Sequence, residues 1–541
     1  MSDQLDGKMT CGQALVKLLE AYQVDTVFGI PGVHTLELYR GLPGRNIRHV
    51  LTRHEQGAGF MADGYARVTG KPGVCFIITG PGLTNIATPI GQAYADSVPM
   101  LVITSVNETH TLGKGWGRLH ETQNQRAISE PLTAFSATAF RVDDIPDLIA
   151  RAFSVFNSER PRPVHIEIPL DVLAAEVSRD WTDDVRLPAR RPVPDLNATS
   201  AAAVLLNNAR RPIIIAGGGA IEASQAIEDL AEKCQAAVFT TVAGKGILPS
   251  LHPLHAGAVL CTESAWDYVA TADVVLAIGT ELADTDIWRD KLPITDKIIR
   301  VDIDPRKMND LYPAEVAIVA DAQAAVDALL DKVAPALHKR EISAELDVLK
   351  TAIAKTQTAL QQKHIAVLNV LQQCLPDNAF IATDMTQIAY TGNYSYDVNR
   401  VRSWLHPTGY GTLGYGLPAG IGAKIGAPDR PGVVLTGDGG FLYTVQELAT
   451  ATEELQSPFV ILLWNNDSLG QIRDDMLALD IPPIGVSPKN PDYIKVAEGF
   501  GCRTQRPESL ASLETALQEA LAYQGVTLIE MHECFVENNN R

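Results

Sequence analysis

The sequence lacks the features that mark membrane, secreted and nucleic-acid-binding proteins. None of its apolar runs is long enough to span a bilayer, and no basic stretch followed by an apolar one opens the chain of 541 residues. Acidic residues outnumber basic ones by 64 to 45, and the resulting net charge of −19 disfavours binding to nucleic acid or to anionic membranes. We therefore expect a soluble, cytoplasmic protein.

Patterns of disulfides and zinc sites are missing as well. The seven cysteines are scattered, odd in number and never arranged as C-x-x-C, which argues against both kinds of cross-link and fits a reducing compartment. There is no low-complexity tract or short-period repeat. A chain of this length predicts about three or four domains. Both of its ends alternate apolar strands with amphipathic helices, so the expected fold class is α/β.

The middle of the chain has no dinucleotide fingerprint. A passage rich in Pro, Arg and Asp at 171–200 reads as a linker, and strands are expected at 212–216, 274–279 and 298–303. The glycine run that follows the first of these strands is not G-x-G-x-x-G, so a bound dinucleotide has weak support. We expect a Rossmann-like middle domain.

What the chain does contain is two polar stretches that each follow a buried apolar strand. One strand leads into Gly437-Asp438-Gly439-Gly440, and the strand at 459–464 leads into Asn465-Asn466-Asp467-Ser468. Residues 442–455 between them have helical spacing, with Glu447 available for the wetter side. Because parallel strands joined by a helix end at the same edge of a sheet, Asp438 and Asn466 are expected to meet there.

The residue types at this edge suit a hard cation and a phosphate. Mg²⁺ prefers oxygen ligands and usually takes only one or two protein side chains together with phosphate oxygens and water. The glycines allow a diphosphate to approach the backbone at the start of a helix, where N–H groups are free. Either piece alone is better read as an ordinary turn or polar loop. Together they predict a site for Mg²⁺ and a diphosphate.

At this spacing the two pieces resemble the GDG-to-NN signature of thiamine diphosphate enzymes. The resemblance implies that Asp438, Asn466 and the backbone oxygen of Ser468 ligate the metal, and that the cofactor contacts the glycine-rich loop at Gly437, Asp438, Gly439 and Gly440, as well as Asn466.

Three further motifs resemble the pyrimidine-binding domain of the acetolactate synthase-like group of these enzymes. They are Glu-Gln-Gly-Ala at 55–58, Gly-Pro-Gly-x-Thr-Asn at 80–85 and Ala-Tyr-Ala-Asp-Ser-Val-Pro at 93–99. In the family, the residue matching Glu55 hydrogen-bonds the aminopyrimidine ring, and the resemblance also places Asn85 among the cofactor-binding residues. From composition alone, Glu55 would be a surface residue that complements a helix dipole.

The resemblance covers essentially the whole chain and implies three doubly wound α/β domains with mainly parallel sheets. Their expected limits are 1–175 for the pyrimidine-binding domain, 190–335 for the Rossmann-like middle domain and 355–541 for the diphosphate-binding domain. The glycine-rich stretch 408–418 implies that Leu413 supports the bent cofactor and that the carbonyl of Gly411 accepts a hydrogen bond from its 4′-amino group. On base rates, Leu413 would be a core leucine.

Two histidines and one aspartate are candidates for chemistry and substrate choice. His34 and His120 are candidate catalytic proton handlers, because histidine is a side chain suited to proton transfer near neutral pH, although structural roles fit them almost as well. Val33, beside His34, is expected at the substrate. Asp475 stands where acetolactate synthases carry Trp, and a carboxylate there suits a substrate ending in guanidinium. A solvated aspartate on a helix surface is an equal alternative.

The resemblance implies a thiamine diphosphate- and Mg²⁺-dependent, non-oxidative decarboxylase of a 2-oxo acid. The expected reaction converts 5-guanidino-2-oxopentanoate to 4-guanidinobutanal and CO2, a step of arginine catabolism. The alternatives are carboligation of the acetolactate synthase type and a catalytically silent relative, and intact Glu55, Asp438 and Asn466 argue against the latter. The segment 280–286 departs from the flavin-binding pattern, so no flavin is expected. The expected assembly is a homodimer or homotetramer with active sites between subunits.

Overall fold

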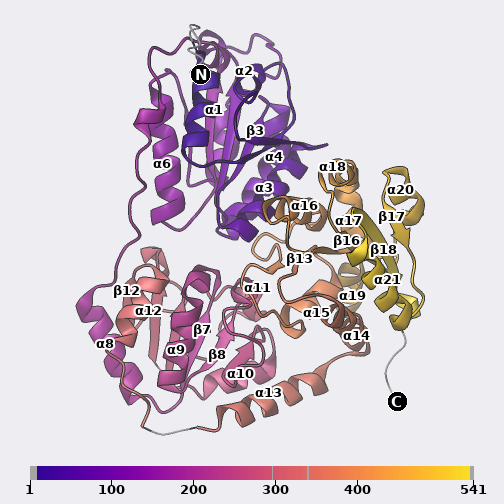
Figure 1. Cartoon of the computed structure of the whole chain (residues 1–541). Coiled ribbons are helices and arrows are strands. Elements are labelled where there is room, and N and C mark those ends of the chain that lie inside the picture. The colour runs from indigo at the N-terminus through magenta and orange to yellow at the C-terminus, as the bar shows by residue number, and fades with distance from the viewer. Residues whose placement is uncertain (1–8, 295–296, 338–339, 537–541) are drawn as a thin grey trace. The chain divides into compact units, whose positions relative to one another are not determined.

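The computed structural model describes residues 9–294, 297–337 and 340–536 (Figure 1). The chain divides into two compact units. Unit 1 runs to Arg190 and also includes Leu417–Pro428 and Thr444–Gln456. Unit 2 holds Arg191–Gly416, Asp429–Tyr443 and the chain from Ser457 onwards. The three domain limits expected from the family resemblance are not tested by this division into compact units, and they stay a prediction.

Three sheets organise the two units, and each has six strands. Every pair of neighbouring strands in them is parallel. The strand orders are β2-β1-β3-β4-β6-β5, β12-β11-β10-β7-β8-β9 and β14-β13-β15-β16-β18-β17. The middle order, renumbered within its sheet, is the 3-2-1-4-5-6 arrangement of a Rossmann fold. The α/β class with parallel sheets is thereby confirmed.

The strands have the following bounds. The first sheet consists of β1 Thr26–Gly29, β2 Arg48–Leu51, β3 Gly73–Ile77, β4 Met100–Val106, β5 Phe135–Thr138 and β6 Val164–Pro169. The second consists of β7 Pro212–Ala216, β8 Ala237–Thr240, β9 His255–Gly257, β10 Val274–Ile278, β11 Lys297–Asp302 and β12 Val316–Val319. The third consists of β13 Phe380–Thr383, β14 Trp404–Leu405, β15 Gly432–Gly437, β16 Phe459–Asn465, β17 Arg503–Gln505 and β18 Val526–His532.

The α-helices alternate with these strands along the chain. Those associated with the first sheet are α1 Cys11–Ala21, α2 Leu36–Arg40, α3 Glu55–Thr69, α4 Pro81–Ala95, α5 Gln125–Ser129, α6 Asp144–Ser158 and α7 Leu170–Leu173. Those around the second are α8 Leu196–Asn208, α9 Ser224–Cys234, α10 Glu263–Ala270, α11 Asp284–Ile287, α12 Ala322–Leu330 and α13 Ile342–Thr356. The remainder are α14 Ala359–Cys374, α15 Gln387–Ser395, α16 Gly416–Gly426, α17 Asp438–Tyr443, α18 Leu448–Glu454, α19 Gly470–Ala478, α20 Tyr493–Gly499 and α21 Leu510–Ala522.

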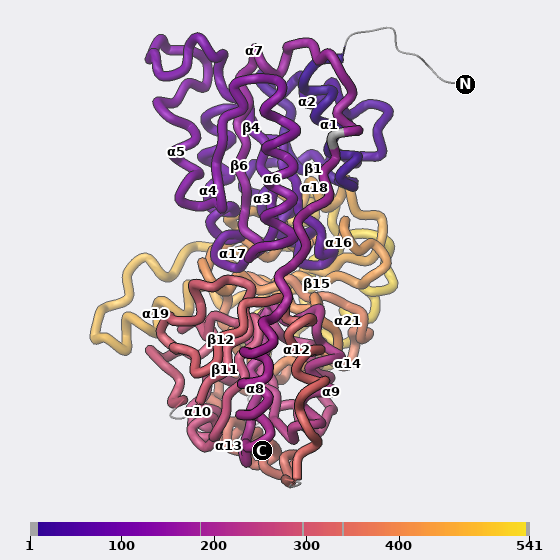
Figure 2. Tube along the Cα trace, turned by 90° about the vertical axis from the view of Figure 1, so that its left-hand side faces the viewer, coloured from indigo at the N-terminus to yellow at the C-terminus, as the bar shows by residue number. Residues whose placement is uncertain are grey.

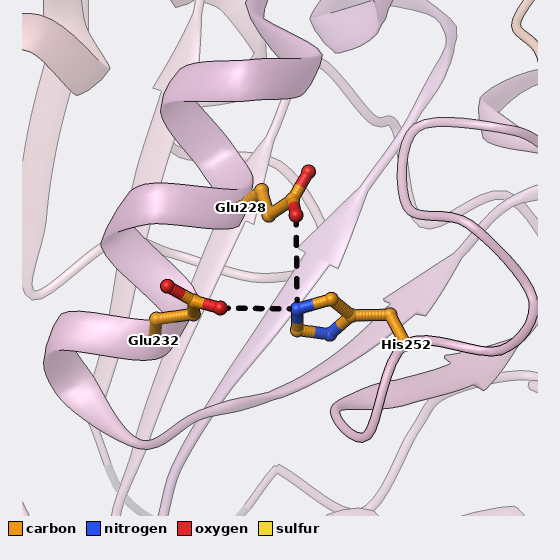
Figure 3. A group of neighbouring side chains, drawn as sticks. All are labelled: Glu228, Glu232 and His252. Carbon is orange, nitrogen blue, oxygen red and sulfur yellow. Dashed lines mark hydrogen bonds and ion pairs between the residues drawn. The ribbon is translucent and has the colours of Figure 1, made fainter.

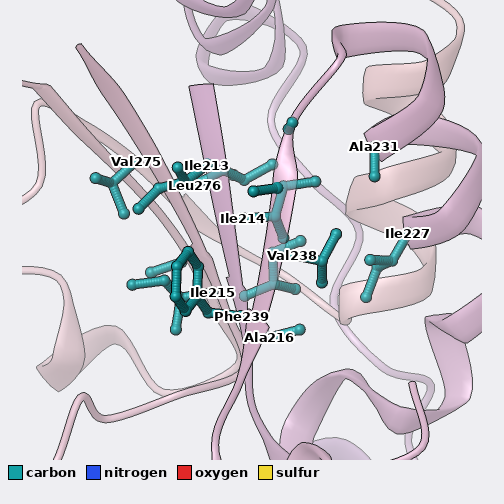
Figure 4. Close-up of a cluster of buried hydrophobic side chains, with 14 of the residues drawn as sticks. Ile213, Ile214, Ile215, Ala216, Ile227, Ala231, Val238, Phe239, Val275 and Leu276 are labelled. Atoms are coloured by element: carbon teal, nitrogen blue, oxygen red, sulfur yellow. The ribbon is translucent and has the colours of Figure 1, made fainter. Parts of the chain in front are cut away.

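The middle sheet shows why its strands read as continuous apolar runs. Every residue of β7 is buried, and successive side chains of a strand point to opposite faces. In Figure 4, Ile227 and Ala231 of α9 lie against the sheet near Ile214 and Val238. Since both faces are covered, no position on β7 is left for a polar side chain. Figures 1 and 2 also place α8 beside α12 and β12.

Two helical stretches of the chain are interrupted by short breaks in the structure. The segment expected as one helix at 442–455 contains the end of α17, a short 3-10 turn at Val445–Glu447 and then α18. Glu447, expected on the wetter side, is fully buried. The helical stretch that starts at Ile342 is also interrupted, because α13 ends at Thr356 and α14 starts with a capping box at Thr358. The hydrophobic period alone does not show these breaks, because both halves of each segment keep helical spacing.

In the described ranges, no helix combines the length and the apolarity needed to cross a bilayer.

Candidate functional site

The carboxyl edge of the third sheet, in unit 2, carries the predicted metal ligands. β15 and β16 are parallel neighbours, with Gly437 opposite Trp464, so the loops that follow them start side by side. Asp438 is 3% exposed, and the N–H groups of Gly439 and Ser468 both interact with its carboxylate. The structure thus brings Asp438 and the loop that contains Asn466 together, as expected from the strand order.

Asp438 is held by neutral donors only. Asn490, just before α20, donates its Nδ2–H to Asp438 Oδ2 at 2.7 Å and to Asp467 Oδ1 at 3.1 Å. Burial raises the pKa of Asp438, and the nearby Asp467 adds to the rise. A buried carboxylate whose hydrogen-bond partners in the described ranges are all uncharged leaves negative charge for a cation to balance.

Asn466 and Ser468 form a tight turn at this edge. The side-chain Oδ1 of Asn466 accepts a hydrogen bond from the Ser468 N–H at 3.1 Å, and the Ser468 hydroxyl donates to the carbonyl of Val486. The turn orders both residues, as Asx-turns do. Whether their oxygens ligate a metal stays a prediction.

The glycine-rich loop packs closely on a residue that the sequence analysis missed. A Cβ on Gly440 would lie 2.6 Å from Asp384 Oδ1, and one on Gly437 would lie 2.9 Å from Thr386 Oγ1. Asp384 is buried, which raises the pKa of its carboxyl. It accepts hydrogen bonds from the N–H groups of Gly414 at 3.0 Å and Gly416 at 2.9 Å. Asp384 therefore ties the loop around Leu413 to the Gly437–Gly440 loop; its position directly after the buried strand β13 was the available signal.

Residues 411–413 are the segment that is expected to support the cofactor. Gly411 has φ +66°, a left-handed conformation that favours glycine. Leu413 is only partly buried, so it is not an ordinary core leucine.

Asp475 lies on α19, the helix that was expected after the metal loop. It is exposed, and its Oδ1 accepts a hydrogen bond from Gln471 at 2.9 Å. The neighbouring Asp474 is more heavily engaged, because it accepts hydrogen bonds from Gln387 and from Arg473. The structure keeps both interpretations of Asp475 open, since an exposed carboxylate is available to a ligand and to water alike.

The carboxyl edge of the first sheet, in unit 1, carries the other predicted residues. Glu55 is the first residue of α3, and Asn85 on α4 donates its Nδ2–H to Glu55 Oε2 at 2.9 Å. A Cβ on Gly82 would lie 3.5 Å from Glu55 Oε1. Asn85, predicted to bind the cofactor, thus lies against the predicted catalytic carboxylate.

Glu447 is a second residue whose role the sequence did not show. Both of its carboxylate oxygens accept hydrogen bonds from the backbone N–H of Arg53 at 3.1 Å, and burial raises its pKa. A Cβ on Gly57 would collide with this carboxylate. Glu447 therefore fixes the chain that enters α3, two residues before Glu55.

The two candidate proton handlers lie side by side in unit 1. The rings of His34 and His120 are 5.1 Å apart between centroids and nearly perpendicular. His34 is buried, and burial, followed by the proximity of His120, lowers its pKa. His120 has φ +60°, and its carbonyl presses on Gly80, where a Cβ would collide with it. Val33 is 61% exposed, so most of its side chain faces solvent.

A separate cluster, on α9 and a loop beside the middle sheet, contains carboxylate and imidazole side chains of the kinds that bind metals. Glu228 and Glu232 on α9 point toward Nε2 of His252 (Figure 3), at 3.8 Å and 3.3 Å respectively. However, Nδ1 of His252 accepts a hydrogen bond from the N–H of Leu254, so the neutral ring carries its hydrogen on Nε2. That hydrogen points at the carboxylates, and Nε2 has no lone pair for an ion. The cluster is a hydrogen-bonding group.

Comparison with known proteins assigns all three parts of the chain. Three family models match it: "Thiamine pyrophosphate enzyme, N-terminal TPP binding domain" at residues 9–129, the central domain of the same enzymes at 199–329, and their C-terminal TPP binding domain at 384–531. The chain belongs to the thiamine pyrophosphate enzyme family. Residues 9–129 include both candidate histidines, Glu55 and Asn85, and residues 384–531 include Asp438, Asn466 and Asp475.

Individual relatives of this family align over nearly the whole chain. "Probable 2-ketoarginine decarboxylase AruI" of Pseudomonas aeruginosa is 62% identical over 528 residues, which cover 97% of this chain and 94% of the relative. Acetolactate synthase isozyme 1 large subunit of Escherichia coli is 33% identical, over 97% of this chain and 94% of its own. The acetolactate synthase large subunit of Corynebacterium glutamicum is 35% identical, over 95% and 85%. The expected resemblance to acetolactate synthase-like thiamine enzymes is confirmed.

Proposed function

We propose that the protein is a thiamine diphosphate- and Mg²⁺-dependent decarboxylase that converts 5-guanidino-2-oxopentanoate to 4-guanidinobutanal and CO2. The observation that carries this proposal is the 62% identity, over 97% of the chain, to a protein named as a 2-ketoarginine decarboxylase. 2-Ketoarginine is the same 2-oxo acid under another name. The TPP binding domains at residues 9–129 and 384–531 support the choice of cofactor.

The edge of the third sheet would hold the metal and the diphosphate. Asp438, Asn466 and the carbonyl of Ser468 are the proposed Mg²⁺ ligands, and all three are oxygen donors of the kind that Mg²⁺ prefers. The uncompensated, buried carboxylate of Asp438 supports this assignment. Two buried acceptor oxygens on the same unit, Asn490 Oδ1 and Gln387 Oε1, have no hydrogen-bond partner in the described ranges, and they fit a site that receives donors from outside the chain.

The edge of the first sheet would activate the cofactor. When bound, thiamine diphosphate supplies the electron sink that takes up the electrons released with CO2. Glu55 is proposed to hydrogen-bond a nitrogen of the aminopyrimidine ring and hold a proton there. Its hydrogen bond from Asn85 and the anchoring of the preceding backbone by Glu447 fix its carboxylate in place. Gly411 and Leu413 are proposed to support the cofactor from the other domain.

Asp475 is proposed to bind the guanidinium at the far end of the substrate. Gln471 occupies only one of its oxygens. A planar guanidinium pairs with a carboxylate through two parallel hydrogen bonds. Asp474 is less suited, because Gln387 and Arg473 already donate to it. The side chain of Val33 is also available to a substrate, since it is exposed.

The proposed working unit is a homodimer or homotetramer in which each active site draws on two subunits. Family resemblance supports this proposal, because related enzymes place their cofactors between the two kinds of domain from different chains. We further propose a cytoplasmic enzyme. None of the seven cysteines is in a disulfide, as expected in a reducing compartment.

The test is an assay of CO2 release with thiamine diphosphate and Mg²⁺ present and the organic product identified by mass spectrometry. The panel contains 5-guanidino-2-oxopentanoate, the uncharged 2-oxohexanoate and pyruvate. We expect the guanidino acid to have the highest kcat/KM and to give 4-guanidinobutanal. A higher kcat/KM for either uncharged acid would refute the substrate.

Carboligation is the second candidate, favoured by the identity of 33% and 35% to two acetolactate synthases. The same assay separates the two reactions. Decarboxylation gives one aldehyde per CO2, whereas carboligation gives an acetohydroxy acid and consumes two 2-oxo acids.

A further inference from the structure

A short chain of buried hydrogen bonds stands behind His34. Its Nδ1 lies 2.9 Å from the hydroxyl oxygen of Thr79, and Thr79 donates its hydroxyl hydrogen to Oγ of Ser105 at 3.0 Å. Thr79 follows β3 and Ser105 lies in β4, and both side chains are completely buried. The sequence analysis singled out neither residue.

The direction of these bonds determines which nitrogen of His34 carries the hydrogen. A threonine hydroxyl has one hydrogen, and here Ser105 receives it. Toward His34 the Thr79 oxygen can therefore only accept, so the donor must be Nδ1–H. A neutral imidazole carries a single N–H. Its other nitrogen, Nε2, is consequently left with a lone pair.

The surroundings of His34 keep this form dominant near neutral pH. Burial lowers the pKa of His34, His120 lowers it further, and Glu108 opposes them with a smaller effect. In the part of the chain that the structure describes, Nε2 of His34 has no hydrogen-bond partner. One nitrogen is thus tethered to the protein, and the other is available to a ligand.

The backbone around the tether is held on both sides. On the His34 side, Thr35 and Gly32 exchange hydrogen bonds within one turn: the Gly32 N–H donates to the Thr35 hydroxyl, and the Thr35 N–H donates to the Gly32 carbonyl. On the Thr79 side, the N–H of Gly80 donates to Oε1 of Gln125 at 2.7 Å. A ring held between two fixed loops keeps its orientation, which a group acting on a substrate requires.

We propose that Thr79 is a positioning residue that fixes His34 as a proton acceptor at Nε2. The inference rests on the proposed decarboxylase function. We assign one step to His34. In this step the O–H bond of a substrate-derived hydroxyl breaks, and its electron pair stays on oxygen. The proton forms a new bond to Nε2, and Nδ1–H remains on Thr79 throughout. His34 can donate only after it has accepted, because its resting Nε2 carries no hydrogen.

His120 lacks such a tether. In the part of the chain that the structure describes, its ring packs edge-on against His34, and no side chain hydrogen-bonds to it. The structure therefore distinguishes two histidines that the sequence left equivalent.

The tautomer can be measured directly, without turnover. In protein labelled with 15N only at histidine, magic-angle-spinning NMR distinguishes ring nitrogens with and without hydrogen. The His34 signals are identified by their loss in His34→Gln. We expect the hydrogen of neutral His34 on Nδ1. In Ser105→Ala, Thr79 is released to donate to Nδ1, and the hydrogen should move to Nε2. A wild-type His34 with its hydrogen on Nε2 would overturn the proposal.

The kinetic consequence is tested with a matched pair at position 79. Thr79→Val keeps the shape but removes the acceptor, whereas Thr79→Ser keeps the hydroxyl. We expect kcat to fall about 10- to 100-fold in Thr79→Val with KM changed by less than about threefold, and to stay within about twofold of wild type in Thr79→Ser. Ser105→Ala should resemble Thr79→Val. Equal kcat values in the two Thr79 variants would contradict the role assigned to Thr79.

The two measurements separate failure of the inference from failure of the proposed function. If no 2-oxo acid is decarboxylated, the proposed function fails, while the NMR result still decides the tautomer. If decarboxylation occurs and the hydrogen lies on Nε2, only the inference fails.

Discussion

The first and third sheets have the same strand order, yet their carboxyl edges carry different chemistry. With each sheet renumbered from its first strand, both read 2-1-3-4-6-5. The edge of the first sheet gathers titratable groups, namely Glu55, His34 and His120. The edge of the third gathers side-chain oxygens and glycine N–H groups around Asp438 and Asn466. Topology thus determines where loops meet, and the residues in the loops determine what the edge does.

The support beneath the two edges differs as well. Each sheet has a buried glutamate on its sixth strand, Glu167 on β6 and Glu530 on β18. Glu167 accepts hydrogen bonds from Thr138 and Gln125, both neutral, and burial raises its pKa. Glu530 pairs with the guanidinium of Arg506 at 2.6 Å. The buried glutamate of the first sheet is therefore held by neutral donors, while that of the third also forms an ion pair.

The largest effect is expected at the edge of the first sheet, where Glu55 is proposed to hold a proton on the cofactor. Glu55→Gln removes the carboxylate but keeps the shape of the side chain, so kcat should fall about 10²- to 10⁴-fold. Thiamine diphosphate should still bind, with affinity within about threefold of wild type, since the proposed diphosphate contacts lie at the edge of the third sheet. Steady-state kinetics and calorimetric titration of the cofactor check the two parts. Unchanged turnover with cofactor bound would remove Glu55 from the mechanism.

The next largest effect is expected at the edge of the third sheet, where Asp438 is proposed to bind Mg²⁺. Asp438→Ala should weaken the binding of Mg²⁺ and thiamine diphosphate by more than about 100-fold, because loss of a ligand should cost at least as much as loss of a residue that orients one. Excess Mg²⁺ and cofactor should recover part of the activity, which they cannot do for Glu55→Gln. Normal cofactor affinity in Asp438→Ala would show that the metal site has been misassigned.

A smaller and selective effect is expected at Asp475. Asp475→Asn should lower kcat/KM for 5-guanidino-2-oxopentanoate. The loss should correspond to about 2 kcal/mol of activation free energy, the low end for a broken charge pair, because this aspartate is exposed. Activity on 2-oxohexanoate should hardly change. Asp474→Asn is the matched control and should not discriminate between the two acids. Equal losses on both acids in Asp475→Asn would make Asp475 a surface residue.

The smallest expected effect concerns the amide of Asn490, which donates a hydrogen bond to Asp438. Asn490→Leu removes the amide that bridges Asp438 and Asp467, and should weaken Mg²⁺ binding about tenfold. The control is Asn208→Leu on the exposed side of α8, which should bind Mg²⁺ as wild type does. Titration of Mg²⁺ followed by calorimetry measures both variants. Wild-type affinity in Asn490→Leu would mean that Asp438 needs no orientation by the amide.

Much of this architecture was predictable, because buried parallel strands read as apolar runs and their ends carry the functional residues. The position of Asp438 beside the Asn466 loop followed from that rule, and Asp384 after β13 could have been found in the same way. Glu447 could not, since its role depends on the backbone of Arg53, far away in sequence. Thr79 and Ser105 were equally hidden, because only the direction of a hydrogen bond reveals their effect on His34.

In the proposed oligomer, the two edges are halves of one active site, contributed by different subunits. The direct test mixes inactive Glu55→Gln protein with inactive Asp438→Ala protein and lets the subunits exchange. Half of the dimers would then be mixed, and each would contain one site with neither substitution. We expect recovery of up to about one quarter of wild-type CO2 release. A mixture that stays inactive although the subunits have exchanged would contradict it.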